Sequence, residues 1–136
     1  MAEDFRTLLK ETFRNDETGE RWFDDLVIGK AFFLSIQAST LHASTPPELL
    51  GDVSSYTAFQ VTVQLKRGVF TCGRRGAWDW LKEKAWWESF VDESPLIRVG
   101  ENIPVQTIQA IYEDIVQVAL EHPEVVSKKC QHYDEA

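Results

Sequence analysis

Two stretches of the chain alternate regularly between apolar and polar side chains. From Thr57 to Leu65 the odd-numbered residues are a threonine and four apolar residues, while the even-numbered ones are an alanine, a threonine and two glutamines. A looser alternation of the same kind runs from Ala31 to Ser39. A period of two with one polar face is typical of an antiparallel sheet that buries one face and wets the other. The pattern therefore predicts two strands of such a sheet.

Two shorter segments are expected to be extended as well. The residues Lys66-Arg67-Gly68 form a turn signal that leads into a short strand from Val69 to Cys72. A second extended piece is expected from Leu96 to Val99. Together these segments predict a small antiparallel sheet of three or four strands.

Helical periodicity predicts two helices before the C-terminal part of the chain. The first runs from Phe5 to Arg14 and stops at the turn-forming residues Asn15 to Gly19. The second runs from about Ala77 to Val91.

The last helix has the most regular pattern in the chain. Asn102 is one possible cap for it, and Pro104 suits its first turn, while Pro123 marks its end. Its apolar residues share an arc of about half the helix circumference. They are Val105, Ile108, Ile111, Tyr112, Ile115, Val118 and Ala119.

These elements predict an α+β fold in which two or three helices pack on one face of the small sheet. The 136 residues suit a single domain, 1–136, with a flexible tail at 128–136. Between the two alternating stretches, Leu41 to Tyr56 carries Pro46-Pro47 and Gly51 and is expected to be a loop. A loop of this length is either functional or a plain surface excursion.

Composition and charge exclude several classes of protein. The chain has 43% hydrophobic residues, which disfavours global disorder. Its net charge of −8 disfavours general binding to duplex nucleic acid. No apolar run is long enough to span a bilayer, and the acidic start lacks the plan of a signal peptide. The cysteines, Cys72 and Cys130, form no disulfide framework. The expectation is a cytoplasmic protein.

The charge is distributed unevenly along the chain. Residues 66–91, here called the tryptophan-rich segment, carry six bases and three acids, whereas the segments on either side are acidic. The segment also contains four of the five tryptophans: Trp78, Trp80, Trp86 and Trp87. It is the part of the sequence with the most distinctive chemistry.

On a helical wheel, the tryptophan-rich segment has two apolar stripes on nearly opposite sides. Trp78 lies on one and Trp80 and Trp87 on the other, with Trp86 between them. A helix that is apolar on two sides must be covered on both. The second stripe either meets a partner, a flat ligand or a second copy of the chain, or lies under the loop or the N-terminal helix. Tryptophan and arginine are typical of interface hot spots and of nucleobase stacking.

The run Gly73-Arg74-Arg75-Gly76 offers an anion site at the entrance of that helix. Backbone N–H groups in a glycine-rich turn can hold a phosphate, and Arg74 and Arg75 would supply the charge. The run matches neither a P-loop nor a dinucleotide fingerprint. A solvated turn with two ordinary arginines is the alternative.

No residue pattern indicates catalysis or a metal site. His42 lies among serines and threonines in the long loop, without a nucleophile elbow or an orienting third group. Asp24-Asp25 and Glu113-Asp114 are sequence neighbours that diverge in direction and form no acid/base dyad. Cys130 and His132 lack further zinc ligands. We therefore expect no enzyme, no metal and no cofactor.

One set of residues resembles a pattern in small proteins encoded by tailed phages and prophages. It comprises Ser35 to Ser39, then His42, Ser44, Thr45, Pro46 and Tyr56, and finally Ile103-Pro104-Val105. The resemblance implies an accessory phage protein of α+β fold, a setting rich in inhibitors of host defence. It assigns no catalytic residue.

The leading hypothesis is an acidic, non-enzymatic protein that inhibits a basic, nucleic-acid-binding host defence protein. Opposite charge would steer the encounter and compete with the anionic ligand of the target. The acidic helix face would occlude the target's basic groove, with aromatic anchors from the tryptophan-rich segment. That face comprises Glu113, Asp114, Glu121 and Glu124.

Two alternatives remain open. The protein could sequester a small nucleotide, with Arg74 and Arg75 on the phosphate and a tryptophan on the base, across a homodimer interface for example. It could also be a small enzyme whose site is not recognisable from the sequence.

Overall fold

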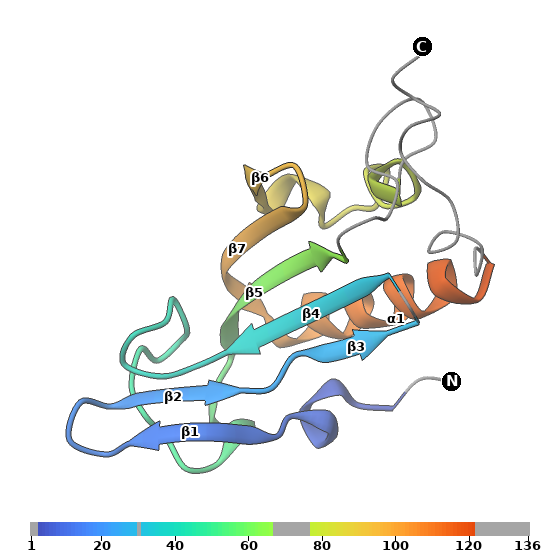
Figure 1. Cartoon of the computed structure of the whole chain (residues 1–136). Helices are drawn as coiled ribbons and strands as arrows, with labels where there is room; N and C mark the ends of the chain where they lie inside the picture. Colours follow the sequence, from blue (N-terminus) through green and yellow to red (C-terminus); the bar gives the residue numbers. More distant parts are fainter. Residues whose placement is uncertain (1–2, 30, 67–76, 122–136) are drawn as a thin grey trace.

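The main body of the protein is a five-stranded antiparallel sheet. The computed structural model describes residues 3–29, 31–66 and 77–121. The strand order in this sheet is β3-β4-β5-β7-β6 (Figure 1). Its strands are β3 (Leu26–Ile28), β4 (Phe32–Gln37), β5 (Ala58–Leu65), β6 (Val91–Ser94) and β7 (Ile97–Pro104).

The two alternating stretches form the centre of this sheet, as predicted. β4 pairs with β5 so that Leu34 lies opposite Val63 and Ile36 opposite Val61. These four side chains are fully buried, whereas Thr62 and Gln64 of β5 are only partly covered. Burial of one face of the pleat is what the period of two requires.

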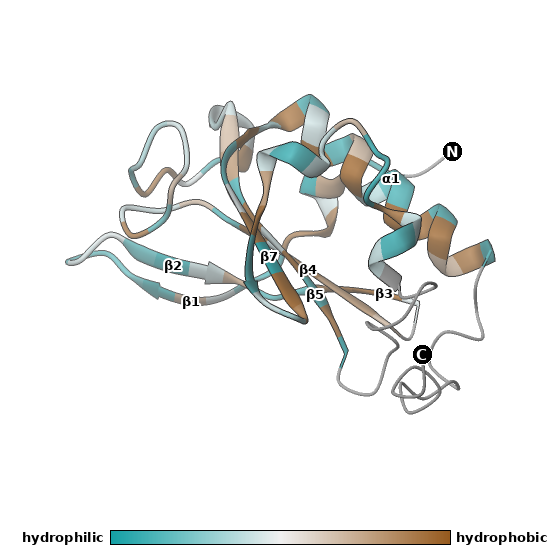
Figure 2. Ribbon diagram, turned by 90° about the horizontal axis from the view of Figure 1, so that it is seen from above, coloured by the Kyte–Doolittle hydropathy of each residue, from teal (hydrophilic) through white to brown (hydrophobic). Residues whose placement is uncertain are grey.

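Helix α1 (Val105–Glu121) packs across the buried face of the sheet (Figure 2). Its buried residues are Ile108, Ile111, Ile115 and Val118. The predicted helix is confirmed, but its start differs from expectation. Pro104 ends β7, and Asn102 sits within that strand with a φ of 51° while its side chain accepts a hydrogen bond from the Thr45 hydroxyl at 2.7 Å. Asn102 is therefore a bend in the strand and not the helix cap.

The N-terminal part of the chain forms a hairpin where a helix was predicted. A short 3-10 helix, η1 (Phe5–Leu8), leads into β1 (Glu11–Asn15), which pairs with β2 (Glu20–Phe23) as a separate two-stranded sheet. The prediction of a helix from Phe5 to Arg14 is wrong because the pairing with β2, a contact distant in sequence, overrides a short helical pattern. The expected turn at Asn15 to Gly19 is present, with Gly19 at a φ of 77°.

The tryptophan-rich segment is also not the predicted helix. In its described part, η3 (Ala77–Trp80) and η4 (Trp87–Ser89) are single 3-10 turns, and Val91 already begins β6. The two opposite stripes of the helical wheel therefore do not exist. The predicted strand Val69–Cys72 and the tail 128–136 lie outside the described residues.

The fold class must be corrected accordingly. The described residues form sheets of two and five strands with one α-helix, and not a three- or four-stranded sheet under two or three helices. The sheet is larger because its outer strands are too short for a period of two to reveal them. No helix in the described ranges is long and apolar enough to cross a membrane.

A buried arginine attaches the long loop to the hairpin. The Arg21 guanidinium is 1% exposed and donates to the carbonyls of Leu50 (2.7 Å) and Ala38 (2.9 Å). The Tyr56 hydroxyl accepts from Arg21 at 3.1 Å and also accepts from the Leu50 N–H at 2.7 Å. The loop, which includes η2 (Val53–Ser55), is thus held by polar contacts to β2.

Candidate binding groove between β3 and α1

Strands β2 and β3 lie along one line and share an outer edge. The β3–β4 register places Leu26 opposite Leu34, and its continuation places Gln37 opposite Phe23 of β2. The Gln37 side chain accepts from the Phe23 N–H at 2.7 Å and donates to the Phe23 carbonyl at 2.9 Å. Between β4 and β2, the Gln37 side chain therefore makes the hydrogen bonds that the backbone would make in a regular strand pair.

This shared edge is covered along β2 but not along β3. β1 pairs with β2, and the last backbone contact on that side is the Asp24 N–H donating to the Lys10 carbonyl at 2.7 Å. η1 then packs on α1 instead of following β3. β3 ends the strand order of the sheet, so no strand of the described chain pairs with its outer side.

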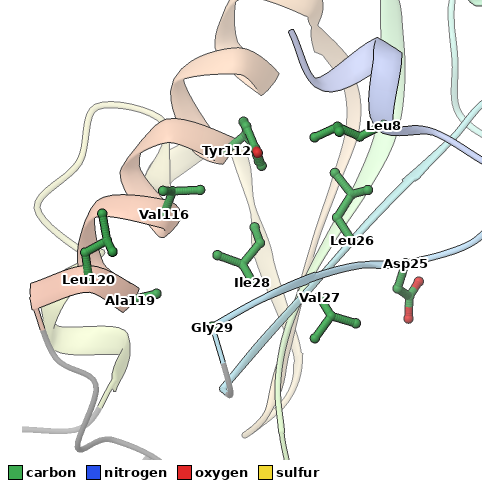
Figure 3. A pocket seen from close by; sticks show the side chains of 10 residues that line it. All are labelled: Leu8, Asp25, Leu26, Val27, Ile28, Gly29, Tyr112, Val116, Ala119 and Leu120. Atoms are coloured by element: carbon green, nitrogen blue, oxygen red, sulfur yellow. The ribbon is translucent and has the colours of Figure 1, made fainter. Parts of the chain in front are cut away.

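A groove of about 510 Å³ lies between this edge strand and α1 (Figure 3). Leu26 and Ile28 point from β3 toward the helix, and Tyr112 and Val116 point from the helix toward the strand. The groove is mainly apolar. Its lining comprises Leu8, Asp25, Leu26, Val27, Ile28, Gly29, Tyr112, Val116, Ala119 and Leu120.

One end of the groove depends on a glycine. Gly29 has a φ of 64°, and a Cβ built on it would lie 2.8 Å from the Cβ of Ala119. Both the backbone conformation and the close approach of strand and helix exclude a larger residue. The pairing of Gly29 with Ala119 therefore sets the separation of β3 and α1.

The charged groups around the groove are mostly acidic. Burial raises the pKa of Asp25 above its ordinary value, and the neighbouring carboxylate of Asp24 raises it further. Burial likewise raises the pKa of Tyr112, with a smaller contribution from Glu3. α1 itself carries no lysine or arginine. The two neighbouring carboxylates would favour a cation beside Asp25, just before β3.

The tryptophans predicted as site residues contact other parts of the fold as well as one another. Trp86 is buried, and its indole N–H donates to the Asp114 carboxylate of α1 at 2.8 Å. The guanidinium of Arg98 stacks on Trp87 at 3.6 Å from the ring centre. The Trp78 indole donates to the Pro95 carbonyl at 2.8 Å. Trp78, Trp80 and Trp87 are partly buried and pack against the core.

The remaining predicted site residues lie only partly within the described chain. Asp114 of the predicted acidic face is engaged by Trp86, whereas Glu113 and Glu121 are exposed and accept hydrogen bonds from Gln109 and Gln117. Arg74, Arg75 and Glu124 lie outside the described residues. A smaller cavity of about 310 Å³ beside Trp86 has no basic residue in its lining.

His42 is held in a buried contact with Ser39. Its Nδ1 lies 2.7 Å from the Ser39 hydroxyl, and both residues are buried, Ser39 completely. The rings of His42 and Trp22 meet at right angles, 4.4 Å between centres. Burial lowers the pKa of His42, the charge of Arg21 adds to this, and the carboxylate of Glu20 opposes it. The pair stabilises the start of the loop.

Metal ligands are also not clustered: no group of three or more His, Cys, Asp or Glu within the three described ranges could hold a metal ion. Comparisons of the chain with family models, curated proteins and solved structures gave no significant match. The groove must therefore be interpreted from its own geometry.

Sequence reasoning missed this groove because three separate segments build it. In the sequence, Asp24-Asp25 is only an adjacent acid pair, and Leu8 falls in a segment predicted to be helical. The available signal was Gly29 directly after a three-residue apolar run, since glycine in a strand context indicates close approach of another backbone.

Proposed function

We propose that the protein is a non-enzymatic acidic binding protein that takes a basic, partly apolar segment of a partner protein into the groove between β3 and α1. The observation that supports this is the groove itself, an apolar trough beside a strand whose outer edge is unpaired in the described chain and whose preceding residues, Asp24 and Asp25, are acidic. Apolar concavities with a few polar groups at defined places are the usual form of binding sites.

The distribution of charge supports a basic partner. Of the 22 acidic residues, 19 lie in the described ranges, against 8 of the 14 basic ones. Two of those bases, Arg21 and Arg98, are buried and hydrogen-bonded inside the fold. The surface of the described chain is thus more acidic than the net charge suggests. Such a surface speeds association with basic partners and repels anionic ones.

The biological setting is proposed from the sequence resemblance. An accessory phage protein in the cytoplasm of the host cell would use this surface against a basic, nucleic-acid-binding defence protein. Occupation of the groove by a basic segment of that protein would compete with its nucleic acid.

The test uses a short amidated peptide of alternating valine and lysine as the probe. We expect it to bind, as measured by fluorescence anisotropy, and to weaken as NaCl rises from about 0.05 M to 0.3 M. A valine–glutamate peptide and a serine–lysine peptide are the controls. If the serine–lysine peptide bound with equal affinity, the apolar groove would not contribute to binding. Absence of binding by the valine–lysine peptide would overturn the proposal.

A further inference from the structure

The outer edge of β3 can pair with another strand. β1 already pairs with β2 along the first part of this edge, and the chain leaves it at Lys10. Beyond this point, no described strand pairs with the backbone of Leu26–Ile28 on its outer side. An unpaired edge of this kind is a template for an extended segment.

The side chains along β3 define two different environments for such a segment. Leu26 and Ile28 face α1 and the groove, while Asp25 and Val27 point to the opposite side of the strand (Figure 3). Neighbouring residues of an added strand would alternate between the same two sides. One side offers apolar surface, and the other offers a carboxylate beside an exposed valine.

We propose that the partner segment binds as an added β-strand along β3 and that its residues alternate between apolar side chains and lysine or arginine. The apolar residues fill the groove under α1, and the basic residues lie near Asp25 on the open side of the sheet. This inference rests on the proposed function and specifies how the groove holds its partner.

The dimensions of the groove fit a short extended segment. Tyr112 and Leu120 are eight residues apart on α1, which corresponds to about 12 Å at the rise of a helix. A strand covers this distance with about four residues. Two of these side chains would face the groove, and two would face the open side. The lining of Leu8, Val116 and Leu120 gives the groove-facing side chains apolar contacts.

The charges of the surrounding elements favour basic residues on the open side. Asp24 and Asp25 lie at the start of β3, and Glu113 and Glu121 are the exposed charges of α1. On the N-terminal segment, the Arg6 guanidinium forms an ion pair with the Asp4 carboxylate at 2.8 Å. Lys10, the other basic residue near Asp24 and Asp25, has no ion-pair partner among the described residues. A partner cation beside Asp25 would offset the repulsion between the two aspartates.

The decisive experiment compares two N-methylated forms of the valine–lysine peptide. In a strand, the N–H groups of successive residues point to opposite edges, so only one of the two alternating sets can pair with β3. We expect methylation of one set to weaken binding by about tenfold or more, and methylation of the other set to change it by less than about twofold.

Two pairs of variants locate the site. Leu120→Ser should weaken binding of the unmodified peptide about fivefold, whereas Leu41→Ser, an exposed leucine in the loop, should leave it unchanged. Asp25→Asn should weaken binding at low salt, with Glu88→Gln as the control. Hydrogen exchange should show new protection at the amides of β3 and none at β6, the other edge of the sheet.

The outcomes separate the two proposals. Binding of the unmodified peptide with equal affinity for both methylated forms would overturn strand addition and leave the proposed function in place. Protection at β6 instead of β3, or self-association through β3 that the peptide cannot displace, would also overturn strand addition. Absence of any binding by the unmodified peptide would overturn both proposals.

Discussion

At the scale of single residues, Gly29 sets the distance between the edge strand and the helix. The residue adopts a left-handed backbone conformation and touches Ala119 where any Cβ would clash. Gly51, by contrast, has open space around it. The same substitution should therefore change the stability of the protein differently at the two glycines.

We expect Gly29→Ala to reduce the free energy of unfolding by about 1–3 kcal/mol, because it adds backbone strain and forces β3 away from α1. Gly51→Ala should be neutral or stabilise by up to about 1 kcal/mol. Urea unfolding of both variants measures this. Equal effects at the two positions would show that the contact with Ala119 is unimportant.

The buried His42 predicts a dependence of stability on pH. Its pKa is lowered in the folded protein, so below its ordinary value of 6.5 the unfolded chain binds more protons than the folded one. Stability should therefore fall as pH decreases through 6.5, by at most about 1.4 kcal/mol per pH unit, until the folded-state pKa is also passed.

The measurement is urea unfolding between pH 7 and 5, about the range in which histidine titrates. His42→Asn keeps a hydrogen-bonding group for the Ser39 hydroxyl and cannot titrate, so its stability should depend less on pH than that of the wild type. The same slope in both proteins would contradict the assignment to His42.

At the scale of elements, the described part of the tryptophan-rich segment contributes Leu81, Trp86 and Phe90 to the core. Its 3-10 turns place Trp86 against α1, and Arg98 of β7 donates to the carbonyls of Trp87 and Phe90 at 3.1 and 2.7 Å. These partners lie on other elements, so they are invisible to a helical wheel. The segment connects α1 with the β6–β7 edge of the sheet.

The contact between Trp86 and Asp114 should contribute to stability. We expect Trp86→Phe to cost about 1–2 kcal/mol through the lost hydrogen bond. Combined with Asp114→Ala in a double-mutant cycle, it should give a coupling energy of about 1 kcal/mol. Glu113→Gln, on the exposed side of α1, should change stability by less than about 0.5 kcal/mol. If the Trp86→Phe variant were as stable as the wild type, the hydrogen bond between Trp86 and Asp114 would not contribute to stability.

At the scale of the whole molecule, the excess of acidic residues is a repulsive term. With 22 acids against 14 bases, like charges on the compact state repel one another. Salt screens this repulsion. Thermal unfolding should therefore occur a few degrees higher in about 0.3 M NaCl than in about 0.02 M.

Sodium chloride and choline chloride should act alike in that experiment, since the effect is general screening. A lower unfolding temperature with added salt would instead mean that favourable ion pairs dominate the surface of the folded protein. Arg14 with Asp16 and Lys82 with Asp79 are examples of such pairs.

The sequence predicted the elements that have a long hydrophobic periodicity with one apolar face. β4, β5 and α1 were predicted correctly because each buries one continuous apolar stripe along its length, and the spacing of apolar residues in the sequence shows such a stripe directly. Composition also established an excess of acidic over basic residues, and the described ranges share it. The phage setting and the inhibitor function remain predictions.

Tertiary structure decided the rest, for a common physical reason. The N-terminal hairpin, the 3-10 turns around the tryptophans and the Gln37 side chain that joins β2 to β4 are each stabilised by partners distant in sequence. The groove likewise exists only where η1, β3 and α1 meet. Local pattern by itself determined which faces are buried, and long-range contacts determined where an unpaired strand edge and an apolar groove lie together.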